Sequence, residues 1–399
     1  MTEHTSNCRG ARNPQGARPR VAIVGAGVNG LGIAWELARA GCPVQVFDAG
    51  EPGHGASWAA AGMLAAAAEA EPGEEALVAL GRQSQGLWPA FAEALKAASG
   101  IDPEYRDEGL LIAAMTRDEA EKLRFDHDYL RRLGLPVDWL SPADLRRREP
   151  HLRQGVQAGI SSPTDHQVNN RKLVAALHRA AVNAGAEVFA HTPVTGIDTE
   201  GGRAGGVIAD GVHHAADAVV IAAGAWSRDL PGLPAALRPP VRPIKGQMLA
   251  LRMDPEAPLL RHVLWAPTVY LVPRRDGRLV IGGTVEERGF EDTMTAGGVY
   301  ALLEAAWRAI PAIEDLPIDE MWVGHRPGSR DDAPILGRTA LDGLWLATGH
   351  HRNGILLAPL TAQAMAAEIL GRAPVADLRP FAPDRFGAAG ARNKEVAST

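Results

Sequence analysis

The sequence predicts an α/β fold in which a parallel, Rossmann-type sheet is interrupted by an antiparallel β-sheet domain. Three segments alternate strand and helix patterns, at residues 20–48, 169–224 and 344–371. The residues between them contain several strand patterns with few helices, which is typical of an antiparallel sheet. The chain has 399 residues, more than one hydrophobic core usually serves, and we therefore expect two domains.

The first of these segments carries a glycine motif. It combines a buried strand, a glycine turn, an amphipathic helix and a second strand, and Gly25, Gly27 and Gly30 give the pattern G-x-G-x-x-G. Gly25 permits the tight turn, Gly27 lets the backbone approach a pyrophosphate, and Gly30 lets the helix pack closely on the strand. A strand, this motif and a helix in succession predict an adenine-dinucleotide site.

The helix after the motif and the acid that ends the second strand complete this prediction. The helix N-terminus, at Val28 and Asn29, offers free N–H groups and the positive end of the helix dipole to the phosphates. Asp48 ends the second strand, where its carboxylate can accept hydrogen bonds from a ribose. This unit does not distinguish a nicotinamide from a flavin dinucleotide.

The other two segments extend the parallel sheet. Asn169 and Asn170 predict the start of a helix, and Gly185 predicts its end. Further strands of this sheet are expected at residues 187–190, 218–224 and 344–349, with a final helix that ends near residue 370. The antiparallel domain is expected to have strands at residues 105–115, 246–253, 269–273, 279–284 and 318–323, and helices at residues 116–132 and 298–309.

Composition and charge exclude several classes of protein. A formal net charge of −6 provides no basic surface of the kind that binds nucleic acid. Cys8 and Cys42 are the only cysteines, which excludes a disulfide framework or a cysteine metal site and fits a reducing cytoplasm. No apolar stretch is long enough to span a bilayer, and residues 1–19 lack the apolar core of a signal peptide. We expect a cytoplasmic protein that binds no metal, no nucleic acid and no membrane.

Two later segments favour a flavin over a nicotinamide. Residues 217–227 form a strand pattern that ends in small residues, which lets the chain pass close to an extended cofactor, although an ordinary core strand has the same pattern. Residues 349–355 form a strand-to-helix junction that aims a second helix N-terminus at a ligand. Such a positive end suits the negative charge that develops on a reduced flavin, and a nicotinamide dehydrogenase has little need of it.

Several segments together resemble a known family. The matching segments are residues 59–64, 193–194, 222–227, 243–246, 270–274, 324–328 and 350–359. With the first motif they span residues 20–385 and resemble the D-amino-acid oxidase superfamily of flavoproteins, most closely the glycine oxidases of thiamine biosynthesis. The family often has Glu at the position of Asp48, Ser or Thr at Trp58 and His at Thr268, and these departures concern local contacts rather than the cofactor.

The resemblance implies a glutathione-reductase-like domain that binds FAD. The FAD is expected to be non-covalent, because no cysteine lies near the C-terminal flavin segment. The turn at residues 61–63 would approach the flavin or the pyrophosphate, the Val194 backbone would meet the adenine, and residues 350–355 would surround the flavin ring. Besides the residues of the first motif, the implied FAD contacts are Ser57, Ala60, Ala61, Gly62, Met63, Val194, Ala223, Gly224, Trp226, Gly324, His350, His351, Arg352, Asn353, Gly354 and Ile355.

The resemblance also implies a binding site for a substrate carboxylate. Arg326 is expected to follow a strand at residues 321–323 and to bind the carboxylate with both arms of its guanidinium. From the residues alone, a salt bridge to Asp331 or Asp332 explains Arg326 equally well. Tyr270 matches a phenol that bonds the same carboxylate, and Arg352 matches a second arginine that supports the carboxylate or the flavin. Val285 is expected to cap the pocket from its place after residues 282–284, although packing in the core explains it equally well.

The implied activity is the oxidation of glycine or another small amino acid. A hydride would pass from the amine Cα to flavin N5, and O2 would reoxidise the flavin, giving H2O2 and an imine for thiazole formation in thiamine biosynthesis. The partners are therefore a small-molecule amine and O2, and a homo-oligomer stays open. A sarcosine oxidase, a D-amino-acid dehydrogenase and a flavin-binding module without amine oxidation remain as alternatives.

The same patterns divide the chain into domains. The FAD-binding domain is expected to comprise residues 20–100, 160–242 and 321–386. The substrate domain is expected to comprise residues 101–159 and 243–320. Residues 1–19 are expected to be a disordered tail and residues 387–399 a flexible one.

Overall fold

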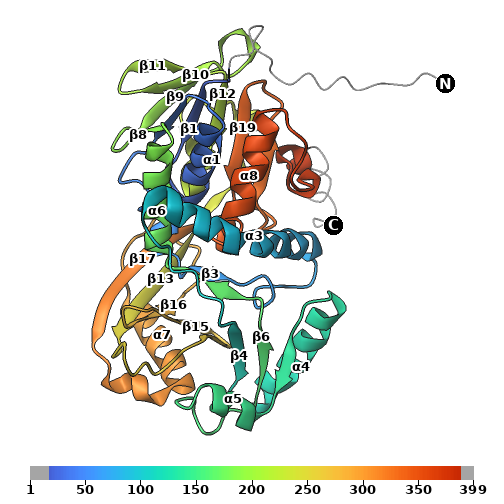
Figure 1. Cartoon of the computed structure of the whole chain (residues 1–399), viewed down its shortest axis with the longest axis vertical. Coiled ribbons are helices and arrows are strands. Elements are labelled where there is room, and N and C mark those ends of the chain that lie inside the picture. The colour runs from blue at the N-terminus through green and yellow to red at the C-terminus, as the bar shows by residue number, and fades with distance from the viewer. Residues whose placement is uncertain (1–17, 388–399) are drawn as a thin grey trace, which may run out of the picture.

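Two lobes lie along the long axis of the molecule in the computed structural model, which describes residues 18–387 (Figure 1). A six-stranded sheet with helices occupies one lobe, and an eight-stranded sheet occupies the other. The expected tails lie outside the described residues, except at residues 18, 19 and 387, and so does Cys8.

The six-stranded sheet contains the doubly wound unit that the glycine motif predicts. In spatial order its strands are β18 (Ile335–Arg338), β19 (Leu344–Thr348), β12 (Ala218–Ile221), β1 (Val21–Val24), β2 (Val44–Phe47) and β8 (Glu187–Phe189). All neighbouring strands are parallel except β18 and β19. Every residue of β1 is buried, as expected for a parallel strand that is covered on both faces.

Each face of this sheet is covered by a different layer. One face carries the helices α1 (Val28–Arg39), α3 (Glu75–Ser99), α6 (Asn170–Asn183) and α8 (Ala358–Ile369) (Figure 1). The other carries an antiparallel sheet of β9 (Val194–Asp198), β10 (Gly206–Ala209) and β11 (Val212–Ala215). Accordingly, Val21 and Ile23 join the core under the helices, while Ala22 and Val24 join the core under the small sheet.

The eight-stranded sheet forms the second lobe. In spatial order its strands are β17 (Ile318–Gly328), β13 (Arg242–Arg252), β16 (Arg278–Gly282), β15 (Val269–Pro273), β14 (Val263–Ala266), β4 (Leu110–Ala114), β6 (Ala158–Ser162) and β5 (Asp138–Leu140). Neighbouring strands are antiparallel, except for the parallel pair β14 and β4. The helices of this lobe are α4 (Arg117–Arg132), α5 (Pro142–Arg148) and α7 (Ala296–Ala309).

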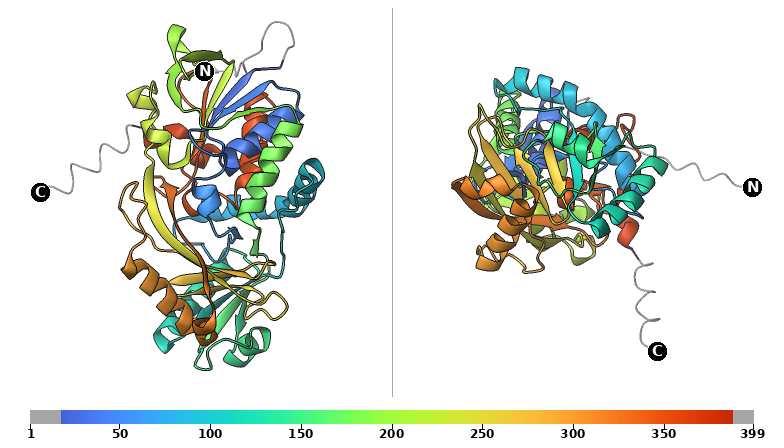
Figure 2. Two further views of the ribbon diagram at one scale, coloured as in Figure 1. Left: turned by 90° about the vertical axis from the view of Figure 1, so that its left-hand side faces the viewer. Right: turned by 90° about the horizontal axis from the view of Figure 1, so that it is seen from below.

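The two faces of this sheet serve different partners. Leu249 and Leu251 of β13 point to the core that α7 covers. The alternate residues Met248 and Ala250 point to the first lobe, where they pack in a cluster with Ala59 and Ala61. Residues 56–64 and 166–167, which join the lobes here, contain α2 (Ala56–Ala59), β3 (Met63–Leu64) and β7 (His166–Gln167). The long strands β13 and β17 run up to the first lobe (Figure 2).

The structure confirms the fold class and most of the predicted elements. The Asn169 side chain caps α6 by accepting a hydrogen bond from the Lys172 N–H, as its position predicts. The sequence analysis missed α3, whose helical pattern Pro89 interrupts, and the small sheet of β9 to β11. Among the described residues, no helix combines the length and the apolar character needed to cross a membrane.

Three strands run across the domain boundaries that we expect. β6 contains the junction of residues 159 and 160, β13 that of residues 242 and 243, and β17 that of residues 320 and 321. All three strands belong to the eight-stranded sheet over their whole length. The division into FAD-binding and substrate domains stays a prediction.

Candidate active site

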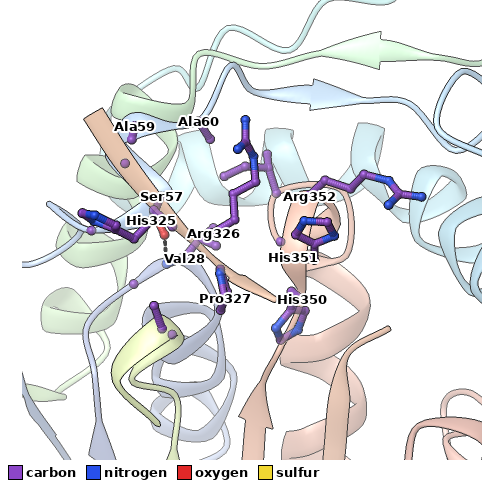
Figure 3. Close-up of a pocket in the computed structure, with 18 of the residues that line it drawn as sticks. Val28, Ser57, Ala59, Ala60, His325, Arg326, Pro327, His350, His351 and Arg352 are labelled. Carbon is purple, nitrogen blue, oxygen red and sulfur yellow. Dashed lines mark hydrogen bonds between the residues drawn. The ribbon is translucent and has the colours of Figure 1, made fainter. Parts of the chain in front are cut away.

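A cavity of about 1040 Å³ lies where the two lobes meet. One end is formed by the glycine loop before α1, and the other by strands β15 and β17. Figure 3 shows Arg326 entering it from β17, and residues 350–352 entering from the turn before α8. All the residues expected to contact FAD or substrate line this cavity, except Gly30 and Asn353.

The three glycines of the motif have different reasons to be glycine. Gly25 has a φ of 105°, and an added Cβ would lie 2.5 Å from the Ala222 carbonyl oxygen. A Cβ at Gly30 would strike the Gly25 carbonyl oxygen, so this glycine lets α1 pack on the turn. Gly27 has a φ of −74°, and a Cβ there would meet only Ser57 Oγ, at 3.2 Å. The fold therefore tolerates a Cβ at Gly27, and the space in front of the loop is what a side chain would fill.

The N-terminus of α1 turns polar groups toward that space. The N-cap residue of α1 is Gly27, which has no side chain that could accept a hydrogen bond from the first turn. The N–H groups of that turn therefore need other partners. The Val28 N–H donates to Ser57 Oγ over 3.0 Å (Figure 3). Asn29 Oδ1 is buried and has no hydrogen-bond partner among the described residues. An open glycine backbone, a helix N-terminus and an unpaired side-chain oxygen fit the phosphates and hydroxyls of a dinucleotide.

The Asp48 carboxylate holds the glycine loop in place. Its Oδ2 accepts a hydrogen bond from the Ala26 N–H over 2.7 Å, and its Oδ1 accepts one from the Gly50 N–H over 2.9 Å. Each oxygen keeps a free lone pair, and Asp48 lines the cavity. Its expected contact with a ribose stays a prediction.

The turn at residues 60–63 is held from the opposite lobe. Arg274, directly after β15, is buried and donates to the carbonyl oxygens of Ala61 and Val168, both over 2.5 Å. It also donates to Asn170 Oδ1 over 3.1 Å. Arg274 lies in a segment that matches the family, but no role was predicted for it, because only the fold brings it under the cavity wall.

Two donors meet at the far end of the cavity. Arg326 Nη1 donates to the Thr284 carbonyl oxygen over 2.9 Å, and Tyr270 Oη donates to Met248 Sδ over 3.3 Å. Both side chains lie against Gly283, where an added Cβ would be 2.9 Å from Arg326 Nη2 and 2.9 Å from Tyr270 Oη. Burial raises the pKa of Tyr270, so its hydroxyl keeps its proton. The pair offers a guanidinium and a phenol to one small anionic group.

Arg326 lies inside β17 and not after it, which corrects the strand end that we expected at residue 323. Its backbone pairs with Ile244 of β13, and the strand continues through Pro327 to Gly328. Pro327 is tolerated because β17 is at the edge of the sheet, where one side of the strand needs no ladder hydrogen bond.

The alternative explanation of Arg326, a structural salt bridge, does not apply. Asp331 pairs with Arg385 at 2.9 Å, and Asp332 lies 3.6 Å from His351. No ion pair within residues 18–387 includes Arg326. Its positive charge therefore faces the cavity without a carboxylate partner.

Arg352 lines the same cavity but has acidic partners. Its Nε lies 3.2 Å from Glu69 Oε2, and its Nη2 donates to Glu74 Oε2 over 2.6 Å and lies 3.7 Å from Glu71 Oε1. Figure 3 shows its side chain directed away from Arg326. These pairs argue against direct contact with a substrate carboxylate, so that role of Arg352 stays a prediction. Glu69 was missed because the alanine-rich residues 65–70, which follow the matching segment 59–64, give no sign of a binding site.

The two histidines before α8 are neutral groups in this wall. Burial lowers the pKa of His350 to about 3 and that of His351 to about 4. His350 Nε2 shares a hydrogen bond with Thr361 Oγ1 over 3.2 Å. Two exposed apolar side chains also line the cavity: Trp226, which stacks on Phe290 at 5.0 Å, and Val285, which is 72% exposed and is therefore not packed in the core.

Comparison with known proteins assigns this arrangement. A family model described as "DAO: FAD dependent oxidoreductase" matches residues 20–368. The chain belongs to the DAO family of FAD-dependent oxidoreductases. FAD is the cofactor of this family, and the glycine cradle of the cavity fits it.

Individual members of the DAO family are similar along nearly the whole chain. A glycine oxidase of Geobacillus kaustophilus (strain HTA426) is 40% identical over 369 residues, which are 92% of this chain and 96% of that protein. The crystal structure of glycine oxidase from Geobacillus kaustophilus superposes with a TM-score of 0.87, covering 92% of this chain and 99% of that one at 39% identity. A bifunctional protein ThiO/ThiG of Trichormus variabilis is 39% identical over 87% of this chain, which spans 52% of that longer protein.

Proposed function

We propose that this chain is an FAD-dependent glycine oxidase. The observation that carries the proposal is the meeting of Arg326 and Tyr270 at one end of a cavity whose other end is a dinucleotide cradle. Arg326 has no carboxylate partner of its own, so it is available to the carboxylate of an amino acid. The similarity to named glycine oxidases over nine-tenths of the chain supports glycine as the substrate.

The residues around Arg326 favour a small substrate. Met63, Met248 and Trp265 line the cavity and belong to one apolar cluster with Tyr270. Such side chains exclude water and leave little room beyond the amine and Cα of glycine. We infer that Arg326 binds the carboxylate with Nη2, while Tyr270 donates a second hydrogen bond, and the two together fix the orientation of Cα.

The reaction needs little from the protein beyond this positioning. Bound FAD supplies a two-electron acceptor that takes a hydride from Cα and is reoxidised by O2, giving H2O2 and an imine that hydrolyses to glyoxylate and ammonia. His350 and His351 stay uncharged at neutral pH, so they form a polar but neutral wall of the cavity. The remaining cavity-lining residues expected from the resemblance are proposed as FAD contacts.

Similarity to fused ThiO/ThiG proteins supports a place in thiamine biosynthesis, where the imine product serves thiazole formation. A cytoplasmic location is proposed from the scarcity of cysteines. We also propose the division into FAD-binding and substrate domains, with the three junctions that fall inside β6, β13 and β17 shifted to the ends of these strands.

The test is a spectrum of the purified protein. We expect bound FAD, bleaching of its absorbance on anaerobic addition of glycine, and release of H2O2 under air. Glycine should be turned over with a higher kcat/KM than sarcosine or D-alanine. A flavin that glycine does not bleach would reject the proposal, and bleaching without peroxide would favour a dehydrogenase.

A further inference from the structure

One wall of the cavity is formed by a carboxylate that the proposed reaction does not use. Glu69 lines the cavity together with Arg326 and Tyr270, and its side chain is 9% exposed. Its Oε2 lies 3.2 Å from Arg352 Nε, yet it receives no hydrogen bond from any described group. A buried carboxylate oxygen without a donor in a substrate cavity calls for a functional explanation.

The backbone of Glu69 is fixed from below. Asp165 Oδ1 accepts a hydrogen bond from the Ala67 N–H over 3.0 Å, and its Oδ2 accepts one from the Ala68 N–H over 2.8 Å. Gln85 Nε2 donates to the same carboxylate over 2.8 Å. The backbone that leads into Glu69 is therefore held in the wall, and the ion pair with Arg352 holds its carboxylate.

The charges around Glu69 leave this wall negative. Arg352 is surrounded by Glu69, Glu74 and Glu71, so one guanidinium faces three carboxylates. Arg326 is the cation that remains free in the cavity, and the substrate carboxylate occupies it in the proposed function. No uncompensated positive charge is left for a second anionic group on the substrate.

We propose that Glu69 determines the charge selectivity of the pocket, by rejecting amines that carry a second carboxylate. This inference rests on the proposed function, in which Arg326 holds the first carboxylate. Glycine and N-methylglycine place only an amine or a methyl group near Glu69. N-carboxymethylglycine would place its second carboxylate in the same chamber as Glu69, where like charges repel in a medium of low dielectric constant.

The experiment compares E69Q with E74Q in the FAD-loaded protein at pH 8.5, where Glu69 is ionised. E69Q removes one buried charge from the cavity wall at nearly constant size. E74Q removes a carboxylate partner of the same arginine, at a residue that does not line the cavity. We expect the ratio of kcat/KM for N-carboxymethylglycine to that for glycine to rise at least tenfold in E69Q and less than threefold in E74Q. An unchanged ratio in E69Q, or an equal rise in E74Q, overturns the inference.

Binding of unreactive acids separates this inference from the proposed activity. Glycolate and diglycolate, which carry one and two carboxylates, are titrated against the FAD spectrum. Diglycolate should bind at least tenfold more tightly to E69Q than to the wild type, whereas the Kd of glycolate should differ less than threefold between the two proteins. If glycine is not oxidised but this difference appears, the proposed function fails and the charge selectivity holds. If glycine is oxidised and the difference is absent, only the selectivity fails.

The wild-type protein provides a further test that needs no variant. Burial raises the pKa of Glu69 to about 7, so lowering the pH from 8.5 to 6 should neutralise its carboxylate. The affinity for diglycolate should then rise relative to the affinity for glycolate. The charged and titratable groups that face Glu69 are Arg352, Arg326, Asp165, Glu71, Glu74 and Tyr270. The pH dependence of this ratio should vanish in E69Q, and its persistence there would contradict the assignment.

Discussion

Replacement of Arg326 by alanine tests the substrate end of the cavity. Arg326 faces the cavity without an acidic partner, and its Nη2 lies with Tyr270 Oη against Gly283. Truncation leaves one donor, the tyrosine hydroxyl, for the substrate carboxylate. The other guanidinium in the wall, that of Arg352, already has three carboxylates and cannot take its place.

The size of the effect follows from the loss of a buried charge pair. Removal of one partner of such a pair costs about 2–5 kcal/mol. At about 1.4 kcal/mol for each tenfold change, kcat/KM for glycine should fall by roughly 30-fold to 5000-fold. The carboxylate contact exists before and during the reaction, so most of the loss should appear in KM.

The assay is the initial rate of peroxide formation at varied glycine concentration. FAD content serves as the control, because the glycine cradle lies at the other end of the cavity and should stay loaded. Arg326→Lys should recover part of the activity, since it restores the charge but not the planar fork. A kcat/KM of Arg326→Ala within threefold of the wild type would refute the assignment of Arg326.

Three further results are expected. Gly27→Val should fold but lose FAD, because the side chain enters the space in front of the loop; a fully loaded yellow protein would contradict this. Tyr270→Phe should lower kcat/KM for glycine about tenfold or more, since hydrogen bonds to charged groups contribute about 1.5–3 kcal/mol, and an unchanged value would exclude the contact. Burial raises the pKa of Glu69 in the folded protein from 4.5 to about 7, so stability is lost as the pH rises from about 4.5 to about 7, by about 3 kcal/mol in total. Thermal unfolding should therefore show Glu69→Gln above the wild type at pH 8.5 and nearly level with it at about pH 4, below the ordinary pKa of glutamate, and equal melting at both pH values would reject the reasoning.

The FAD end of the site is the part that local sequence predicts best. The glycine motif, the helix after it and the acid at the end of the second strand lie within residues 20–48, and short-range geometry determines what each does. The structure separates their functions further, since Gly25 and Gly30 satisfy the fold while Gly27 keeps the cavity open. That distinction depends on neighbours such as Ala222 and Ser57, which are distant in the sequence.

The substrate end could be predicted only through the family resemblance. Arg326 lies on β17, which pairs with β13, and Tyr270 lies on β15, which pairs with β16. Their spacing along the chain gives no indication that the two side chains meet. The end of β17 was misplaced because Gly324 and Pro327 are typical of a strand terminus, whereas an edge strand accommodates both. Glu69 carries no local pattern at all, and its significance comes from burial beside Arg352.

Trp58 shows how a departure from the family pattern is accommodated. The guanidinium of Arg171 lies 3.6 Å from the centre of the Trp58 ring and 4.9 Å from that of Trp322. Arg171 also pairs with Glu320 at 2.8 Å. The larger side chain at position 58 therefore adds a cation–π contact between α2 and α6, whereas a serine or threonine there would leave the arginine over the Trp322 ring alone.

The two ends of the cavity depend on each other through the second lobe. Arg274 follows the strand that carries Tyr270, and its guanidinium holds the carbonyl oxygen of Ala61, whose backbone lines the FAD end. A buried arginine that bonds only to neutral oxygens is costly to place, since burial disfavours its charge, and these bonds offset the cost only while both lobes keep their positions. One side chain, that of Arg274, thus links the Ala61 backbone at the FAD end of the cavity to strand β15, which carries Tyr270. This coupling explains why neither lobe alone contains a complete site.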